Sequence, residues 1–265
     1  MIERRTRRIQ ADFGHLGPDD AARSAAAASP ARDFTAALRA RDDVAVIAEV
    51  KKASPSAGMI AGDCNVVGQA MSYQAGGATA ISVLCEPEEF HGSFADLAAV
   101  RAAVELPVLC KDFVVDPIQL HIARANGADA VLLMVSVLGE RLGEYLSLAH
   151  ELGMQGLVEV HDDAELEVAR QAQAMLVGVN GRDLRDLSMN AERARGVMAE
   201  AAAIGGVTVV AESGVGSRDD VEAAAHAGAD AVLIGSLLMR SAIPGVELER
   251  LTGVKRQRHG RVRHV

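Results

Sequence analysis

Eight short apolar runs recur along the chain, and this repetition restricts the possible folds more than any other feature of the sequence. Each run is followed by a segment with the spacing of an amphipathic helix, and successive runs begin about 20 to 35 residues apart. The runs cover residues 44–50, 78–84, 107–110, 128–135, 156–160, 175–179, 207–211 and 229–234. Strands that alternate with helices at this interval predict βα units and a parallel sheet.

The segments between the runs carry helix start and stop signals. Start signals stand at Ser93, at Asp116-Pro117, at Asp162 with Glu165, and at Ser217 with Asp220. Three segments end in glycine, within residues 75–78, 125–129 and 227–230, where a left-handed residue would close the helix and lead into the next strand. We therefore expect a complete helix between successive runs.

Eight strands alternating with helices predict an α/β fold, a (β/α)8 TIM barrel. A doubly wound sheet is the main alternative, but it more often has fewer strands, and the glycine-rich turn expected after its first strand is missing. The 265 residues are 49% hydrophobic and 3% aromatic, which suits one large aliphatic core. We expect an N-terminal helical extension at residues 1–43, the barrel at 44–252 and a basic, disordered tail at 253–265.

The extension begins with arginines at positions 4, 5, 7 and 8, for which a solvated, frayed end is the simplest interpretation. An alanine-rich segment around residues 19–29 predicts one helix. Ser29-Pro30 predicts the start of another, running through Phe34 and Leu38. The basic ends leave recruitment of an acidic partner or RNA open, although a solvated face is the more common role of such residues.

Polar residues stand where the apolar strands end. In the first run Ile47, Glu49 and Lys51 share one face of the strand, because side chains alternate between faces. The whole set of such residues is Glu49, Lys51, Ser54, Ser56, Lys111, Asp112, Glu159, His161, Asn180, Arg182, Glu212, Ser213, Gly214, Gly235 and Ser236. Barrel active sites lie at the carboxyl ends of the strands, so this set predicts an active site there.

The charged members of this set suit acid–base chemistry on an anionic substrate. Lys111 could donate a proton to a carbonyl or a departing hydroxyl, and Glu159 could remove or return one. Lys51 would disfavour a second positive charge and so lower the pKa of Lys111. Arg182 offers a planar fork for a carboxylate or phosphate. A Schiff-base role for either lysine stays open, and His161, beside a helix cap, is expected to be structural.

The loops after the last two strands predict a phosphate site. Ser213-Gly214 and Gly235-Ser236 follow those strands, where barrels often bind phosphate with loop amides and the start of a short helix. Glycine lets the main chain approach the phosphate closely. Ordinary turn glycines are the alternative.

Charge and cysteine content narrow the class of protein. A formal net charge of −9 argues against a general nucleic-acid binder, so an anionic ligand would need a local cationic cluster. Cys64, Cys85 and Cys110 lack metal or dithiol spacing and are expected to be small core residues in a reducing compartment. No apolar run has membrane-spanning length and the N-terminus lacks the apolar core of a signal peptide, so we expect a soluble, cytoplasmic protein.

The strand-end motifs resemble those of the indole-3-glycerol phosphate synthase family, in order and around the whole barrel, from about residue 34 to residue 251. They read V-I-A-E-V-K-K-A-S-P-S-A-G, I-S-V-L-C-E, P-V-L-C-K-D-F, L-V-E-V-H, N-G-R-D-L, A-E-S-G and I-G-S-L-L-M. The resemblance implies a carboxy-lyase of tryptophan biosynthesis that acts on 1-(2-carboxyphenylamino)-1-deoxyribulose 5-phosphate. That family closes the indole ring with loss of carbon dioxide and water, and needs no cofactor or metal.

The resemblance also implies individual roles. Lys111 matches the general acid that protonates the ribulose carbonyl as the aromatic ring attacks, and Glu159 matches the acid–base group of the later dehydration. Lys51 matches a second lysine that anchors substrate or transfers protons, with Glu49 as its carboxylate partner. The other matches are Asn180, Arg182 and Glu212 around the polar groups, Ser56 near the carboxylate, Phe113 beside the anthranilate ring, and Ser213, Gly214, Gly235 and Ser236 at the phosphate. The segment before residue 44 matches an extension that covers the barrel mouth.

The chain departs from the family pattern at a few places. Cys85 stands where the family usually has Thr, and Gly181 where a second Asn is common. The loop after Ser56 lacks the usual basic residue and the Asp-Pro before the first barrel helix. These departures bear on closure of the mouth more than on the catalytic groups.

Two other functions remain as alternatives. One is a different phosphate-binding barrel, an isomerase or aldolase of a related sugar phosphate. The other is a degenerate barrel kept for binding or scaffolding, against which the intact charged set argues. We expect a small anionic sugar-phosphate substrate, no nucleic-acid or membrane partner, and a monomer or weak dimer.

Overall fold

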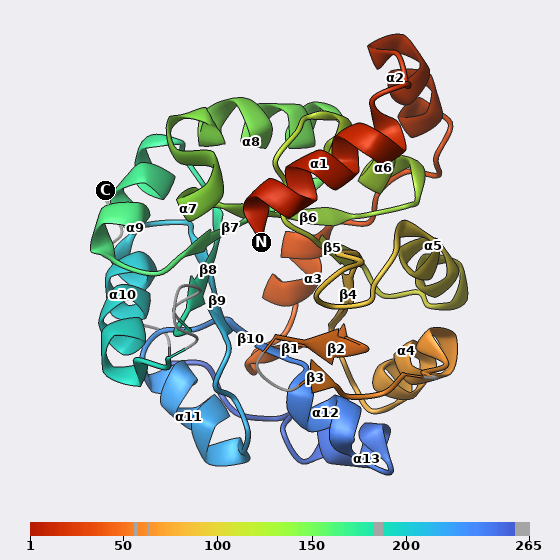
Figure 1. Cartoon of the computed structure of the whole chain (residues 1–265). Helices are drawn as coiled ribbons and strands as arrows, with labels where there is room; N and C mark the ends of the chain where they lie inside the picture. Colours follow the sequence, from red (N-terminus) through yellow and green to blue (C-terminus); the bar gives the residue numbers. More distant parts are fainter. Residues whose placement is uncertain (56–57, 63, 183–187, 258–265) are drawn as a thin grey trace.

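A computed structural model describes residues 1–55, 58–62, 64–182 and 188–257 of the chain. Eight parallel strands close into a barrel, and Figure 1 looks along its axis. The strands are β1 (Ala45–Val50), β4 (Ala80–Leu84), β5 (Val108–Lys111), β6 (Ala130–Met134), β7 (Gln155–Val160), β8 (Leu176–Asn180), β9 (Thr208–Glu212) and β10 (Ala231–Ile234). The predicted TIM barrel is therefore confirmed, and the predicted strand ends differ from these by at most two residues.

Helices surround the barrel and cover the outer faces of its strands (Figure 1). They are α4 (Val66–Ala75), α5 (Phe94–Ala103), α6 (Ile118–Ala125), α7 (Val135–Leu138), α8 (Leu142–Glu151), α9 (Asp163–Gln171), α10 (Ala191–Ala203), α11 (Arg218–His226), α12 (Ser236–Arg240) and α13 (Pro244–Glu249), with a 3-10 turn at Gly139–Arg141. The side chains of Ser93, Asp162 and Ser217 cap their helices as predicted, each accepting from the N–H three residues on. Gly77 and Gly228 have φ of 90° and 98°, the left-handed helix ends that the sequence predicts.

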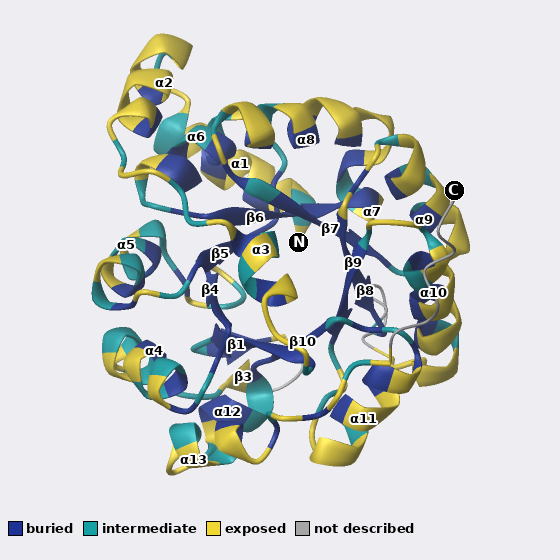
Figure 2. Ribbon diagram, turned by 180° about the vertical axis from the view of Figure 1, so that it is seen from behind, coloured by how far each residue is buried: buried dark blue, intermediate teal, exposed yellow. Residues whose placement is uncertain are grey.

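The strands are buried on both faces, as the dark blue barrel of Figure 2 shows. Outward side chains pack against the helices in one large aliphatic cluster. Inward side chains fill the barrel in a second cluster, which includes Ile47, Leu109, Leu157, Val210 and Leu233. Because side chains alternate, the next inward position on each of these strands lies two residues further on, at the carboxyl end. Four of these positions carry charged residues of the site, Glu49, Lys111, Glu159 and Glu212, and the fifth is Gly235.

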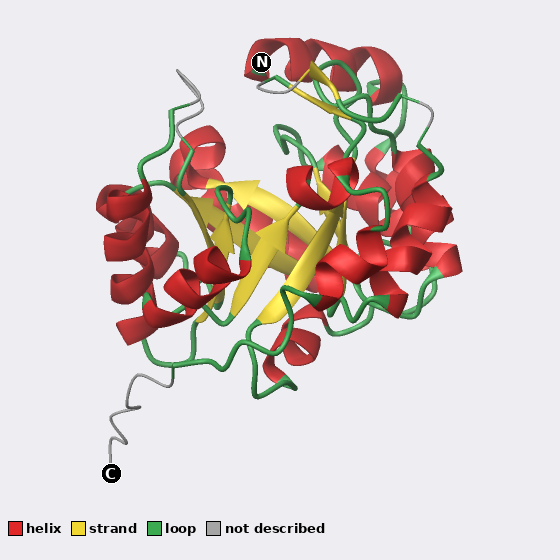
Figure 3. Cartoon of the chain, turned by 90° about the horizontal axis from the view of Figure 1, so that it is seen from below, coloured by secondary structure: helices red, strands yellow, loops and turns green. Residues whose placement is uncertain are grey.

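The N-terminal extension contains α1 (Ile2–Phe13), α2 (Pro18–Ala26) and α3 (Phe34–Arg39). Only α1 lies at the mouth, on the side to which the strands point in Figure 3. Helix α3 lies at the opposite end, where Phe34 and Leu38 are fully buried against the first residues of the strands. The expected cover over the mouth is therefore limited to α1, because the aromatic and aliphatic face of α3 fills the base of the barrel.

Two expectations for the extension are wrong. The helix predicted to begin at Pro30 begins at Phe34, capped by Asp33, because the N–H of Arg32 donates to Asp129 Oδ1 at 2.7 Å and holds the preceding segment outside the helix. The basic start is not a frayed end. It forms α1, and Arg5 within it is 3% exposed.

Two short segments near the ends of the barrel also differ from expectation. The chain after β1 forms an unpredicted two-stranded ribbon, β2 (Ala53–Ser54) with β3 (Gly58–Met59), beside the mouth. At the base, residues 253–256 are not a disordered tail, because Val44 N–H donates to the Val254 carbonyl at 2.7 Å and Arg256 pairs with Asp230 at 3.2 Å. Residues 258–265 lie outside the described part of the chain.

Candidate active site

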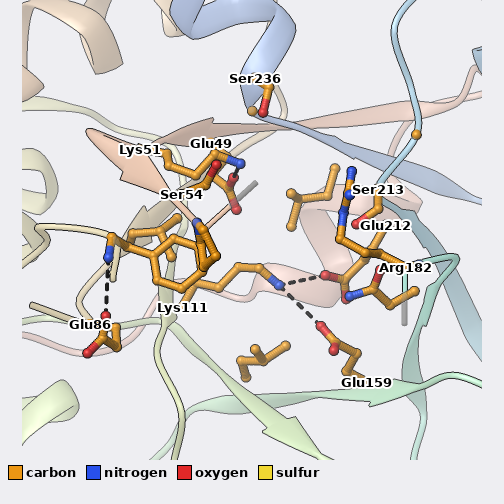
Figure 4. A pocket seen from close by; sticks show the side chains of 18 of the residues that line it. Glu49, Lys51, Ser54, Glu86, Lys111, Glu159, Arg182, Glu212, Ser213 and Ser236 are labelled. Atoms are coloured by element: carbon orange, nitrogen blue, oxygen red, sulfur yellow. Dashed lines mark hydrogen bonds and ion pairs between the residues drawn. The ribbon is translucent and has the colours of Figure 1, made fainter. Parts of the chain in front are cut away.

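A cavity of about 490 Å³ opens at the carboxyl ends of the strands, within the size range of small-molecule sites. The predicted residues that line it are Glu49, Lys51, Ser54, Lys111, Asp112, Phe113, Glu159, Asn180, Arg182, Glu212, Ser213, Gly214, Gly235 and Ser236. They come from six of the eight strand ends. Figure 4 shows the labelled ones pointing into one space: Glu49, Lys51, Ser54, Lys111, Glu159, Arg182, Glu212, Ser213 and Ser236. The convergence expected from the sequence is present, while Ser56 lies outside the described residues.

Lys111 occupies the centre of the cavity between two carboxylates. Its Nζ lies 2.6 Å from Glu212 Oε2 and 3.3 Å from Glu159 Oε2 (Figure 4). The side chains of both glutamates are 2% exposed and that of Lys111 is 14% exposed. One cation thus faces two buried anions, an arrangement that forces a competition for protons.

That competition determines the protonation of the three groups. Burial opposes the charge of Lys111, but the carboxylates of Glu212, Glu159 and Glu49 outweigh it and raise the pKa of the ammonium above its ordinary value. Burial, together with the charge of Glu159, raises the pKa of Glu212 to about 7 in spite of Lys111. The pKa of Glu159 is instead lowered, because Lys111 and His161 outweigh its burial. Lys111 is therefore a protonated acid at neutral pH.

Two expectations about the lysines change accordingly. Lys51 does not lower the pKa of Lys111, because its own charge is matched by Glu49, with Nζ 2.7 Å from Oε1. A Schiff-base role for Lys111 is disfavoured, because the nucleophile would have to be the neutral amine. Lys51 and Glu49 form a separate pair that lines the same cavity.

Two glycines leave space for the carboxylates of Glu49 and Glu212. A Cβ atom at Gly235 would overlap Oε1 of Glu49 and lie 3.1 Å from Lys51 Nζ. A bulky residue at Gly235 would therefore disturb the Glu49–Lys51 pair as well as any bound phosphate. If Gly235 served phosphate binding alone, the substitution would weaken substrate binding only, whereas here it should also affect the Glu49–Lys51 pair. Gly178, inside β8, leaves space for Glu212 in the same way. A glycine within an apolar strand often indicates that another group approaches the backbone closely, and this signal at Gly178 was missed.

The cavity has an apolar side. Phe113, predicted as a wall, is 7% exposed, and its ring centroid lies 6.1 Å from that of Phe90. Phe90 was missed, because its loop after β4 has no recognisable motif. Leu84 and Met134 continue this side of the lining. The combination of an aromatic wall with central charges suits a ligand that is aromatic at one end and ionic elsewhere.

The loops after β9 and β10 line the cavity on another side. Ser213 and Gly214 have φ of 65° and 79°, so the chain turns sharply at the end of β9 and its main chain faces the cavity. Gly235-Ser236 lead into α12, whose last residue, Arg240, also lines the cavity. Arg240 was missed, because it stands just after the I-G-S-L-L-M motif that the sequence singles out.

Helix α1 reaches the site through Arg5. Its Nε donates to Asp112 Oδ1 at 2.9 Å, a second nitrogen bonds Oδ2, and both side chains are buried. Asp112 follows Lys111 directly, so this pair joins the extension to the end of β5. Burial raises the pKa of Asp112 to about 6, although Arg5 opposes the shift. No sequence signal distinguishes Arg5 from the three arginines around it.

The remaining sequence expectations concern cysteines, metals and membranes. Cys85 and Cys110 are buried side by side, with Sγ atoms 3.5 Å apart, and Cys64 is half-buried against the core, as expected. Among the described residues no three His, Cys, Asp or Glu side chains are grouped as a metal site. In that same part of the chain no helix is both long and apolar enough to cross a membrane.

Comparison with known proteins gives one family. Residues 1–251 match the family model described as indole-3-glycerol phosphate synthase. Indole-3-glycerol phosphate synthase 2 of Streptomyces coelicolor is 50% identical over 233 residues, covering 86% of this chain and 88% of the relative. The indole-3-glycerol phosphate synthase of Mycobacterium avium is 49% identical over 226 residues, covering 83% and 80%.

Similar solved structures share the fold at low sequence identity. The tryptophan synthase alpha chain of Legionella pneumophila superposes with a TM-score of 0.63 at 12% identity, covering 83% of this chain and 95% of that one. Thiamine phosphate pyrophosphorylase of Pyrococcus furiosus superposes with a TM-score of 0.58 at 16% identity, covering 78% and 93%. At these identities the likeness bears on the barrel alone.

Proposed function

The chain belongs to the indole-3-glycerol phosphate synthase family, and from that premise we propose how its cavity carries out the family's reaction. It is a carboxy-lyase of tryptophan biosynthesis, which closes the ring of 1-(2-carboxyphenylamino)-1-deoxyribulose 5-phosphate to indole-3-glycerol phosphate and releases carbon dioxide and water. The observation that carries our assignment of roles is the ammonium of Lys111 between the carboxylates of Glu159 and Glu212.

We propose that the substrate spans the cavity from its aromatic wall to the loops after β9 and β10. The anthranilate ring would lie against Phe113, with Phe90 behind it. The phosphate would be held by main-chain amides at Ser213-Gly214 and Gly235-Ser236, with Arg240 at the rim. In this orientation the ribulose chain crosses the centre of the cavity, next to Lys111.

Lys111 is the general acid of ring closure in this proposal. The ring carbon that bears the carboxylate attacks the ribulose carbonyl carbon, and the carbonyl oxygen gains negative charge as the new carbon–carbon bond forms. Nζ of Lys111 donates a proton to that oxygen and converts it to a hydroxyl. Its raised pKa keeps the amine protonated before the attack, so the donor is present at neutral pH. Loss of carbon dioxide then restores the aromatic ring.

Glu159 acts in the dehydration that follows. The hydroxyl leaves as water when it receives a second proton, and the neighbouring carbon loses one to form the indole double bond. Glu159 is ionised at neutral pH, because its pKa is lowered, and can accept that proton. We propose that Lys51, which pairs with Glu49 and lines the cavity, anchors the substrate or supplies the proton to the leaving hydroxyl.

The other polar groups orient the substrate. We propose that Asn180, Arg182 and Glu212 contact the hydroxyl and carboxylate groups of the substrate. From the family resemblance alone we also propose that Ser56, outside the described residues, binds near the carboxylate. No cofactor or metal takes part in these steps. We further propose that the enzyme is cytoplasmic, works as a monomer or weak dimer, and has no nucleic-acid or membrane partner. We propose that the chain divides near residues 43 and 252 into an N-terminal extension, the barrel and a C-terminal tail.

The test is an assay of the purified chain with the carboxyphenylamino-deoxyribulose phosphate, followed by the fluorescence of the indole product. We expect saturable turnover that needs no added metal or coenzyme. Treatment with borohydride in the presence of substrate should leave the enzyme active, since no Schiff base forms. Covalent trapping on Lys111 or Lys51 would overturn the assignment of Lys111 as an acid and favour the aldolase alternative.

A further inference from the structure

His161 lies between two carboxylates, that of Glu159, which lines the cavity, and that of Glu165, which does not. It follows β7 two residues after Glu159, and its Nε2 is 3.5 Å from Glu159 Oε1. On the other side its Nδ1 is 2.9 Å from Oε2 of Glu165, a residue in the first turn of α9. The side chains of Glu159, His161 and Glu165 are 2%, 11% and 21% exposed, so the series runs from the buried site towards solvent.

Glu165 fixes the orientation and the tautomer of the imidazole. Its Oε2 also accepts the main-chain N–H of His161 at 2.8 Å, which holds the carboxylate against the ring. An ionised carboxylate only accepts hydrogen bonds, so Nδ1 must carry a proton. In the neutral ring Nε2 then has a lone pair, and this lone pair faces Glu159 Oε1.

One proton must therefore lie between His161 and Glu159. Nε2 and Oε1 are both buried, and neither has a hydrogen-bond partner among the described residues. A lone pair 3.5 Å from a carboxylate oxygen, both away from water, is unfavourable. The contact becomes favourable when Nε2 is protonated and donates to Glu159, or when Glu159 is protonated and donates to Nε2. The pair exchanges one proton between these two forms.

The groups around the ring favour the form with the imidazolium. Burial of His161 opposes its charge, but Glu165, Glu159 and Glu212 face it and together raise its pKa. On the cavity side the cation Lys111 contacts Glu159 through its other oxygen, Oε2. Glu159 thus uses one oxygen towards the substrate side and the other towards His161.

We propose that Glu159, His161 and Glu165 form a proton relay that restores the protonation state of Glu159 in each turnover. The inference rests on the proposed role of Glu159 in dehydration. After Lys111 has protonated the carbonyl oxygen, the imidazolium passes its Nε2 proton through Glu159 to Lys111, and the ring is left neutral with its proton on Nδ1. Glu159 then accepts the substrate proton during dehydration and passes it to the free Nε2, so Glu159 and His161 return to their starting state while Glu165 holds the Nδ1 proton. No bond other than N–H and O–H changes, and His161 acts through Glu159 as a positioning residue.

The first test uses His161→Gln, which keeps a hydrogen-bond donor but cannot carry charge or exchange a proton. We expect kcat to fall by about 10-fold or more with little change in KM, because substrate binding does not involve His161. Without the imidazolium the pKa of Glu159 rises, so the acidic limb of the kcat–pH profile moves to higher pH. Glu165→Gln should shift the profile in the same direction by a smaller amount. The matched control is Asp163→Asn, which removes an exposed carboxylate from the same helix turn and should leave the profile unchanged.

The second test does not depend on activity. The ring nitrogens of His161, followed by nitrogen NMR, should titrate above the ordinary histidine range, and Glu159→Gln should lower that titration. A kcat–pH profile of His161→Gln that matches the wild type, with turnover within twofold, would overturn the relay. A His161 ring that stays neutral through the profile's acidic limb would overturn it as well. A wild-type chain that is inactive on the substrate would refute the proposed function instead, while the NMR result would stand on its own.

Discussion

Gly178→Ala is the substitution whose effect follows most directly from the geometry of the site. The added methyl group would overlap Oε1 of Glu212, and the carboxylate would have to move by about 1 Å to reach an ordinary contact distance. The bond between Glu212 and Lys111, now 2.6 Å, could not survive such a movement. The backbone itself tolerates alanine, because Gly178 lies within β8 and has no positive φ.

The size of the effect follows from the bond that is lost. A hydrogen bond between charged groups contributes about 1.5 to 3 kcal/mol, which corresponds to roughly 10- to 100-fold in rate if Glu212 holds Lys111 in position for proton transfer. A misplacement of about 1 Å at a catalytic group is known to have effects of this order. We therefore expect kcat of Gly178→Ala to fall by about 10- to 100-fold. Steady-state kinetics by indole fluorescence measures it.

Gly156→Ala is the matched control, because Gly156 is also a strand glycine, on the neighbouring β7. Its added methyl would meet Leu146 and Leu133 at 2.6 and 3.0 Å, between the strands and the helices and away from the cavity. It should lower the free energy of unfolding by about 1 to 3 kcal/mol and leave kcat unchanged. If Gly178→Ala kept kcat within twofold, or if both variants lost activity equally, the claim that Glu212 positions Lys111 would be refuted.

Three further predictions concern binding and the extension. Arg182→Ala should raise KM by about 10-fold with a smaller change in kcat, since the fork binds the substrate throughout the reaction; an effect on kcat alone would count against that role. Arg5→Ala should lower the free energy of unfolding, measured with urea, by roughly 3 kcal/mol, because it leaves the Asp112 carboxylate buried without its partner. Adding Asp112→Asn to the Arg5→Ala chain should recover part of this loss. The pKa of Asp112 is raised to about 6 from an ordinary 3.8, so between these pH values the folded state binds more protons than the unfolded state. This group should therefore contribute roughly 3 kcal/mol to the free energy of unfolding at pH 4, and the contribution should be lost as the pH rises through 6. A difference in unfolding free energy between wild type and Asp112→Asn that stays flat over this pH range would contradict the prediction.

The barrel and most of its site could be predicted because they depend on local patterns. Apolar runs, caps such as Ser93 and left-handed glycines such as Gly127 act within a few residues of themselves, and the side-chain alternation of a strand carries Ile47 over to Glu49. Once the strands close into a barrel, their ends necessarily meet. The positions of Lys111 and Glu159 in one cavity follow from that closure.

The missed features depend on contacts between distant parts of the chain. Arg5 can be buried because its guanidinium pairs with Asp112, which follows β5 and lies 107 residues away in the sequence. Phe34 fills the base of the barrel because eight strands leave a gap there, which no property of its own segment reveals. The pKa of Lys111 was predicted to fall because Lys51 seemed its nearest charge, yet the pairing of Lys51 with Glu49 leaves Lys111 to two other carboxylates. Spacing along the chain identifies the charges but not their partners.

The central claim is that Lys111, kept protonated between Glu159 and Glu212, is the acid of ring closure. Lys111→Met removes the proton donor at similar length, and the measurement is kcat by indole fluorescence together with the dissociation constant of an unreactive substrate analogue. We expect kcat to fall by about 100-fold or more and the dissociation constant to change little, because the donor acts only as negative charge develops on the carbonyl oxygen. Near-normal turnover in Lys111→Met, or a loss that appears only in the dissociation constant, would contradict the account and make Lys51 the candidate acid.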